Sequence, residues 1–211
     1  MFRRLKLPIK RVAVVALLML AVSGCYMPLR FDAEIVLERT GHYSFIFDGY
    51  LAKVDIYEDL RTNKIKVGTP EERERVANVE NDLKRDPSTK ELKYHKKGVF
   101  KINWTREGDL IATRSVTFVR RNEHILGISY NKKTGYISLL GKSLSRDVKN
   151  QLREKGLDMS GQLRVITDAK VTTHNATSVK RFRKKGPNYK VYIWKFANLL
   201  APTPSLKISM R

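Results

Sequence analysis

The single cysteine of this 211-residue chain, Cys25, is the side chain best suited to covalent chemistry, because a thiol reacts through its thiolate form. The small residues Ser23 and Gly24 precede it, and the aliphatic Val22 lies three positions before it. Small residues allow a peptidase to bring the peptide bond between residues 24 and 25 close to its catalytic groups. No second cysteine is present for an intramolecular disulfide. The pattern therefore points to modification of the sulfur and cleavage beside it.

The residues before Cys25 have the layout of a secretory signal. Residues 1–11 carry five basic residues and no acidic one, and residues 12–22 are an uninterrupted apolar run. That run is too short for a membrane-crossing helix, which needs about 20 residues, but it suits the apolar region of a signal peptide. We therefore predict a signal peptide over residues 1–24. An uncleaved anchor helix is an alternative, and Arg3-Arg4 raises a twin-arginine signal as another.

Val22-Ser23-Gly24-Cys25 resembles the lipobox of bacterial lipoproteins. The resemblance implies a diacylglyceryl thioether on Cys25, cleavage before it and acylation of the new amino group, with residues 25–30 as the lipidated N-terminus and a short tether. Each buried acyl CH₂ contributes about 0.8 kcal/mol, so two or three chains anchor a protein stably. Tyr26 stands where an Asp would favour inner-membrane retention, so the outer membrane is favoured if the organism has one. The alternative is an ordinary signal peptide with a chance cysteine.

The chain is strongly basic, with a formal net charge of +21. The first 24 residues supply five of these charges, which leaves +16 for the remainder. Such a charge indicates an anionic partner: nucleic acid, an anionic membrane or a polyanionic envelope polymer. Export separates a protein from nucleic acid, so we expect an anionic lipid or an envelope polymer and no nucleic acid.

One basic segment is the best candidate for that contact. It surrounds an aromatic residue with cations: Lys180, Arg181, Phe182, Arg183, Lys184 and Lys185, followed by Lys190. Each basic residue near an anionic surface contributes about 1 kcal/mol, so this segment could reinforce the anchor and orient the domain. The alternative is a solvated hairpin tip whose charge keeps it soluble. A smaller cluster is formed by Lys93, His95, Lys96 and Lys97.

The sequence offers little that predicts catalysis, a metal or a cofactor. The four histidines are widely spaced and form no zinc-binding motif, and neither a G-x-S-x-G nucleophile motif nor a phosphate-binding glycine loop occurs. Glu71-Glu72 lie where the first turn of a helix is expected, which favours the helix dipole. His174-Asn175 has two interpretations, a turn-capping pair or a ligand contact. We therefore expect no enzymatic activity, no metal site and no cofactor.

Apolar periodicity predicts one α+β domain over residues 31–211, with a curved antiparallel sheet and two helices packed against it. The helices are expected to begin after Thr69 and after Ser143 or Ser145. Gly49 indicates a bulge or bend. Strands are expected over 31–37, 43–57, 92–104, 110–120, 124–130, 134–140, 161–174, 189–198 and 205–210.

The strand over 189–198 is apolar on both faces. Tyr189, Val191 and Ile193 lie on one face, and Tyr192, Trp194 and Phe196 lie on the other. Both faces must therefore be covered. One interpretation is that the sheet packs on a helix and also encloses an apolar pocket, and the other is that both faces belong to an ordinary core.

Residues 161–208 contain the segments "HNAT", "YIWKF" and "PSLKI". In this order they resemble the C-terminal part of LppM-like bacterial lipoprotein domains. The resemblance implies an extracytoplasmic α+β domain that binds lipid or glycolipid, and it transfers no catalytic residue. Members often carry a membrane segment after the domain, and we expect none here.

Two functions remain open at this point. The first is a membrane-anchored, extracytoplasmic module that binds a lipid, a glycolipid or another envelope component. The second is a structural or assembly lipoprotein that docks onto an envelope protein complex through its basic face. An enclosed apolar pocket would favour the first function, and a flat exposed patch would favour the second.

Overall fold

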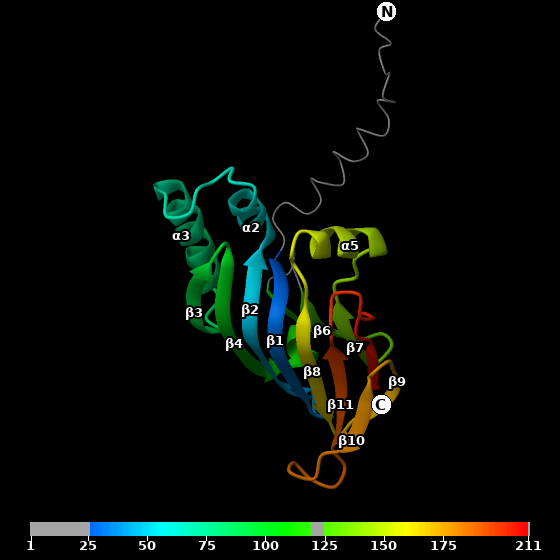
Figure 1. Ribbon diagram of the computed structural model, residues 1–211. Coiled ribbons are helices and arrows are strands. Elements are labelled where there is room, and N and C mark those ends of the chain that lie inside the picture. The colour runs from blue at the N-terminus through cyan, green and yellow to red at the C-terminus, as the bar shows by residue number, and fades with distance from the viewer. Residues whose placement is uncertain (1–25, 120–124, 211) are drawn as a thin grey trace, which may run out of the picture.

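Two β-sheets dominate the computed structural model, which describes residues 26–119 and 125–210 (Figure 1). The larger sheet has seven strands in the order β10-β11-β8-β1-β2-β4-β3, and the smaller has five in the order β5-β6-β7-β12-β9. The first group comprises β1 (Tyr26–Leu37), β2 (His42–Lys53), β3 (Thr89–Lys96), β4 (Val99–Asp109), β8 (Ser160–Thr167), β10 (Ser178–Arg181) and β11 (Lys190–Phe196). The second comprises β5 (Ser115–Phe118), β6 (Leu126–Asn131), β7 (Tyr136–Gly141), β9 (Lys170–His174) and β12 (Leu206–Ser209).

The helices connect the strands. Their bounds are α2 (Val54–Arg61), α3 (Pro70–Lys84), α4 (Leu110–Thr113) and α5 (Arg146–Glu154). Of these, α2, α3 and α5 lie at the end of the sheets where β1 begins (Figure 1). The predicted caps are confirmed. The Thr69 hydroxyl accepts a hydrogen bond from the Glu72 amide at 3.4 Å, and the Ser145 hydroxyl accepts one from the Val148 amide at 3.3 Å.

The strand β1 sets the layout of the larger sheet. It pairs antiparallel with β2 and parallel with β8, so most but not all of the sheet is antiparallel. The register with β2 shifts between Pro28 and Phe31, opposite Gly49. A Cβ atom at Gly49 would lie 2.4 Å from the Arg30 carbonyl oxygen. The predicted irregularity is therefore confirmed, with the extra residue on β1.

Aromatic side chains fill the space between the two sheets. Tyr43, Phe45 and Phe47 alternate along the inner face of β2 and are fully buried, as predicted. Phe47 stacks on Phe118 of the smaller sheet, with ring centroids 4.1 Å apart. This contact joins the two sheets into one core.

The α+β class is confirmed, and four details differ from expectation. Residues 26–30 are not a tether, because they form the start of β1, with Tyr26 and Met27 buried. Residues 54–57 begin the helix α2. Residues 110–113 form the short helix α4, capped by the Asp109 carboxylate. The single expected sheet is also divided in two, because the chain from β5 to β7 leaves the first sheet and builds the second.

Candidate functional site

An apolar pocket of about 140 Å³ lies between the ends of the two sheets, beneath α5. Apolar side chains form almost all of its surface. Its walls come from the start of β1, from α5, from the smaller sheet and from the segment after β11; they include Tyr26, Met27, Pro28, Phe31, Phe47, Leu126, Leu144, Val148, Leu152, Leu163, Phe196, Leu199 and Ala201. Figure 1 shows α5 at the end of the sheets where β1 begins.

The floor of the pocket is aromatic. The Phe31 ring lies 5.5 Å from Phe47 and 5.6 Å from Phe196, centroid to centroid. The bulge in β1 sits next to Phe31 in the sequence. Phe196 is the last residue of the strand that is apolar on both faces. The interpretation in which this strand lines a pocket is therefore confirmed for Phe196.

The helix α5 forms the roof with one narrow apolar face. Leu144, just before the helix, and Val148 and Leu152 within it line the pocket, at the spacing that places residues on one side of a helix. The Lys149 ammonium donates a hydrogen bond to the Ala201 carbonyl at 3.2 Å. This bond ties the roof to the wall formed by the segment after β11.

Asp158 also holds the segment after β11, which forms this wall, in place. Its carboxylate accepts hydrogen bonds from the amides of Leu199 at 2.6 Å and Met159 at 2.8 Å, and it pairs with Arg153 of α5 at 3.1 Å. Burial alone would raise the pKa of Asp158, but these two amides and the guanidinium together lower it. The ionised carboxylate is thus the form that holds the wall in place.

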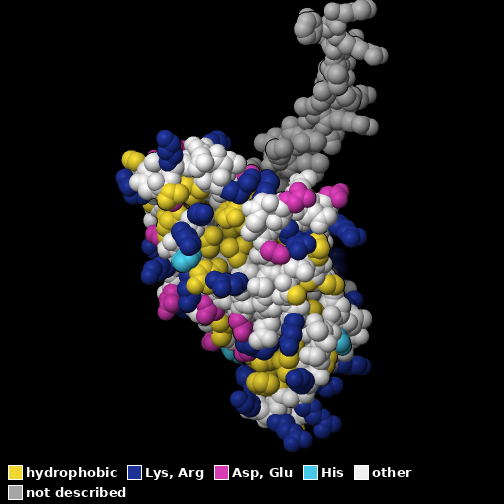
Figure 2. All heavy atoms as spheres, in the orientation of Figure 1, with side chains coloured by type: hydrophobic (Ala, Val, Ile, Leu, Met, Phe, Trp, Pro, Cys, Tyr) yellow, Lys and Arg dark blue, Asp and Glu magenta, His cyan; other side chains and the backbone are white. Residues whose placement is uncertain are grey.

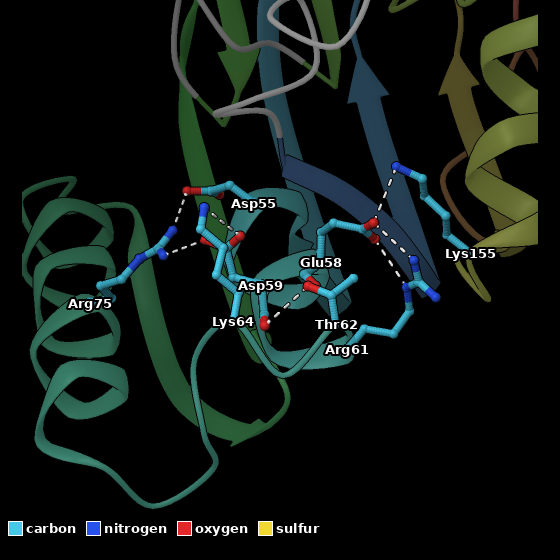
Figure 3. Close-up of polar contacts among 8 residues, drawn as sticks. All are labelled: Asp55, Glu58, Asp59, Arg61, Thr62, Lys64, Arg75 and Lys155. Atoms are coloured by element: carbon cyan, nitrogen blue, oxygen red, sulfur yellow. Dashed lines mark hydrogen bonds and ion pairs between the residues drawn. The ribbon is translucent and has the colours of Figure 1, made fainter. Parts of the chain in front are cut away.

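Ion pairs join the end of α5 to α2, and others join α2 to α3 (Figure 3). The Lys155 ammonium, directly after α5, lies 3.4 Å from the Glu58 carboxylate of α2. On the other side of α2, Arg75 of α3 contacts Asp59 at 2.6 Å and Asp55 at 3.0 Å. Hydrogen bonding from Arg61, followed by the charge of Lys155, lowers the pKa of Glu58. The pair between Lys155 and Glu58 thus connects the end of α5 to α2, and neither residue lines the pocket.

The predicted lipidation motif, Val22, Ser23, Gly24 and Cys25, lies outside the described residues. The next residue in the chain, Tyr26, is the first one that the structure describes. Tyr26 is bonded to Cys25, is buried and lines the pocket. The predicted anchor position is therefore one residue away from the pocket wall.

The predicted basic segment forms the hairpin between β10 and β11. Lys180 and Arg181 belong to β10, and Arg183, Lys184 and Lys185 lie in the turn, all of them exposed. Phe182 is half-buried and packs on the small cluster of Val36, Ile166 and Val191. In this position Phe182 secures the hairpin to the sheet.

The smaller cluster Lys93, His95, Lys96 and Lys97 lies on and after β3, at the opposite edge of the seven-stranded sheet from β10. The two basic clusters are therefore not brought together.

The capping interpretation of His174-Asn175 agrees with the contacts of His174, whose ring Nδ1 accepts a hydrogen bond from the Ala176 amide at 3.2 Å, whereas Asn175 makes longer-range contacts. The Asn175 amide oxygen accepts hydrogen bonds from the Trp194 indole at 2.8 Å and the Ser205 amide at 2.7 Å. Its amide nitrogen donates to the carbonyl of Thr203, a residue that lines the pocket, at 2.9 Å. Asn175 thus holds part of the pocket wall.

Sequence reasoning missed the segment 199–204 as part of the site, because its apolar residues have no helix or strand period. The only signal was its composition, Leu-Leu-Ala-Pro-Thr-Pro directly after an apolar strand. Within residues 26–119 and 125–210, no group of three metal-binding side chains occurs. No helix in the same part of the chain is long and apolar enough to cross a membrane.

No family model matches the chain, and no curated protein matches it in sequence. Among solved structures, the chain is similar to the folded domain of the Mycobacterium tuberculosis protein LppM, determined by NMR. The two are 13% identical, with a TM-score of 0.39, and the match covers 89% of this chain and 91% of the other.

Proposed function

We propose that this protein is a membrane-anchored, extracytoplasmic lipoprotein whose domain binds one acyl chain of a lipid or glycolipid in the pocket beneath α5. The observation that supports this proposal most directly is the position of the pocket. Its wall begins at Tyr26, the residue bonded to the predicted lipidation site. An anchor on Cys25 would hold this end of the domain against the bilayer, where acyl chains are found.

The size and lining of the pocket support an acyl chain as ligand. An engineered apolar cavity of about 150 Å³ stays dry and binds benzene, so a pocket of about 140 Å³ suits a segment of roughly six carbons. Burying six methylenes from water would contribute about 5 kcal/mol. The remainder of the lipid would stay outside the pocket, and Lys142 and Lys149, which are among the lining residues, would suit an anionic headgroup.

Occupancy of the pocket can be tested with Ala201→Phe. Ala201 lines the pocket and uses its backbone, not its side chain, in the contacts to Asn198 and Lys149. The larger ring should fill the space while those bonds remain. The matched control is Ala77→Phe, the same change at an exposed position of α3.

The measurement is photo-crosslinking in vesicles that contain the full protein and a phospholipid with a diazirine on its acyl chain. We expect cross-linked peptides from the pocket walls in the wild type and in Ala77→Phe, and at least a tenfold loss in Ala201→Phe. Equal labelling of all three proteins, or labelling confined to other surfaces, would rule out the pocket as the binding site.

The anchor is tested separately by intact mass and membrane fractionation of the wild type and Cys25→Ala. Acyl mass on the wild type alone, together with its recovery in the membrane fraction, is the expected result. A wild type without acyl mass would disprove lipidation.

A further inference from the structure

Six cations surround the hairpin between β10 and β11 at the end of the molecule remote from the pocket. Figure 2 shows Lys and Arg side chains gathered at this protruding tip. The group comprises Lys180, Arg181, Arg183, Lys184, Lys185 and Lys190, all exposed. Among the described residues, only one of the six lies within ion-pair distance of an acid: Lys185, 3.9 Å from Glu38. The nearby Asp168 pairs with Arg39 instead. The tip therefore keeps a strong positive charge.

The hairpin is held in place by its aromatic residues. Phe182 and Tyr189 are half-buried against Val36, Ile166 and Val191. The Phe182 amide donates a hydrogen bond to the Tyr189 carbonyl at 2.8 Å, and the Lys185 amide donates one to the Phe182 carbonyl at 3.3 Å. The aromatic rings thus face the sheet, and the cations form the outer surface of a convex tip. Such a convex tip can place most of its charges against a flat anionic surface such as a bilayer.

Strand register places this tip far from Tyr26. Leu37, at the far end of β1, pairs with Thr167 of β8, and Thr167 pairs with Lys190 of β11. Eleven residue steps along a strand span about 36 Å. Electrostatic attraction is screened within about 8 Å at physiological ionic strength. With β1 starting at Tyr26, no tether is left to let the domain fold back. A membrane at Cys25 would therefore not attract the hairpin of an upright domain.

We propose that the hairpin binds a second anionic bilayer surface, so that the protein bridges two membranes. This inference rests on the anchor of the proposed function, which fixes the opposite end of the molecule. The cations would contact lipid phosphates of the second bilayer, and no side chain would need to insert. The hairpin would then have a different role from the expected one, reinforcement of the anchor at the same membrane.

The test is clustering of two vesicle populations. The full protein is reconstituted into neutral phosphatidylcholine vesicles, and co-flotation with them measures the anchor. Fluorescently labelled acceptor vesicles containing phosphatidylglycerol are then added, and two-colour energy transfer measures clustering. The variant is Lys180→Gln with Lys184→Gln. The matched control is Lys93→Gln with Lys96→Gln, which removes the same charge from the other edge strand of the sheet.

We expect wild type and control to cluster anionic acceptors but not neutral ones. The hairpin variant should need about 30-fold more acceptor lipid, because each basic residue near an anionic surface is worth roughly a fivefold gain in binding. Flotation without clustering would overturn the bridging inference but leave the anchor intact. Failure to float would overturn the anchor and the inference with it. Binding to soluble polyphosphate but not to acceptor vesicles would identify a polymer as the partner and overturn the bilayer.

Discussion

The start of β1 and the β10–β11 hairpin lie at opposite ends of one sheet. The two ends differ in how tightly their aromatic residues are packed and in whether their charges are paired. At the first end, Tyr26, Phe31 and Phe196 surround unfilled apolar space. Charges at that end, such as Lys155 and Glu58, pair with each other. At the hairpin end, the apolar space is filled by Phe182 and Tyr189, and the charges are left mostly unpaired and exposed.

This contrast separates features that stabilise the fold from features that can bind a ligand. Apolar side chains that are closely packed and charges that are paired already have their partners within the chain, so they stabilise the fold. An apolar pocket and an unpaired cluster of cations both leave an interaction unmade. The first suits an acyl chain and the second suits an anionic surface, so the two ends are suited to different parts of lipid molecules.

The largest expected difference between the two ends is in the free energy of unfolding lost when one aromatic residue at each end is replaced with alanine. We expect Phe47→Ala to lower the free energy of unfolding by about 4 kcal/mol, since it removes a fully buried ring stacked on Phe31 and Phe118. Phe182→Ala, at a half-buried position, should cost only about 1 kcal/mol. Urea denaturation of both variants provides the measurement. Equal losses would show that the hairpin cluster is part of the main core.

Salt should affect the two proposed sites differently. Raising the salt concentration from 0.1 to 1 M shortens the screening length from about 10 to about 3 Å. Vesicle clustering through the hairpin should then weaken by at least about 100-fold, because it depends on six exposed cations. Acyl cross-linking in the pocket should stay within about twofold, because its lining is apolar. Clustering that survives high salt would contradict an electrostatic contact.

The sequence predicted the parts of this contrast that depend on local pattern. Alternation located the inner face of β2, and the caps at Thr69 and Ser145 located α3 and α5. Clustered cations located the hairpin. Each of these signals comes from residues close together in the chain.

The pocket could not be located in the same way, because it depends on long-range register. Phe31 and Phe196 meet only because β8 lies between β1 and β11 in the sheet. Leu199 and Ala201 join them through the contacts of Asp158 and Lys149. The expected tether failed for a similar reason. Residues 26–30 were expected to be a short tether, whereas pairing with β2 and β8 makes this segment a strand.

Removing one aspartate at each end should have a smaller and more local effect on stability and on acyl cross-linking. Asp158→Ala removes the acceptor for the amides of Leu199 and Met159, which should cost about 1–2 kcal/mol and reduce acyl cross-linking several-fold. Asp168→Ala removes a comparable acceptor at the hairpin end, for the Arg39 amide at 2.8 Å. It should cost a similar amount but leave cross-linking unchanged. Unchanged cross-linking in Asp158→Ala would show that this wall does not shape the site.

The smallest expected effect is confined to alkaline pH. Burial, followed by the hydrogen bond to Glu72, raises the pKa of Tyr94 from 10.0 to about 12. A raised tyrosine pKa stabilises the folded state fully below pH 10, and this contribution is lost as the pH rises through 12. Tyr94 lies in β3, where its hydroxyl accepts a hydrogen bond from the Gly98 amide at 3.2 Å. Tyr94→Phe should therefore cost about 1 kcal/mol at neutral pH and flatten the stability profile between pH 10 and 12.

The matched change at the other end is Tyr189→Phe. The pKa of Tyr189 is also raised, by burial and then by the charges of Asp168 and Glu38, but its hydroxyl does not join a helix to a strand as that of Tyr94 does. Denaturation at a series of pH values, with tyrosinate absorbance recorded in parallel, should show a larger reduction of the alkaline loss in Tyr94→Phe than in Tyr189→Phe. The reverse result would place the alkali-sensitive contact at the hairpin, where apolar packing and not hydrogen bonding is expected to hold the structure together.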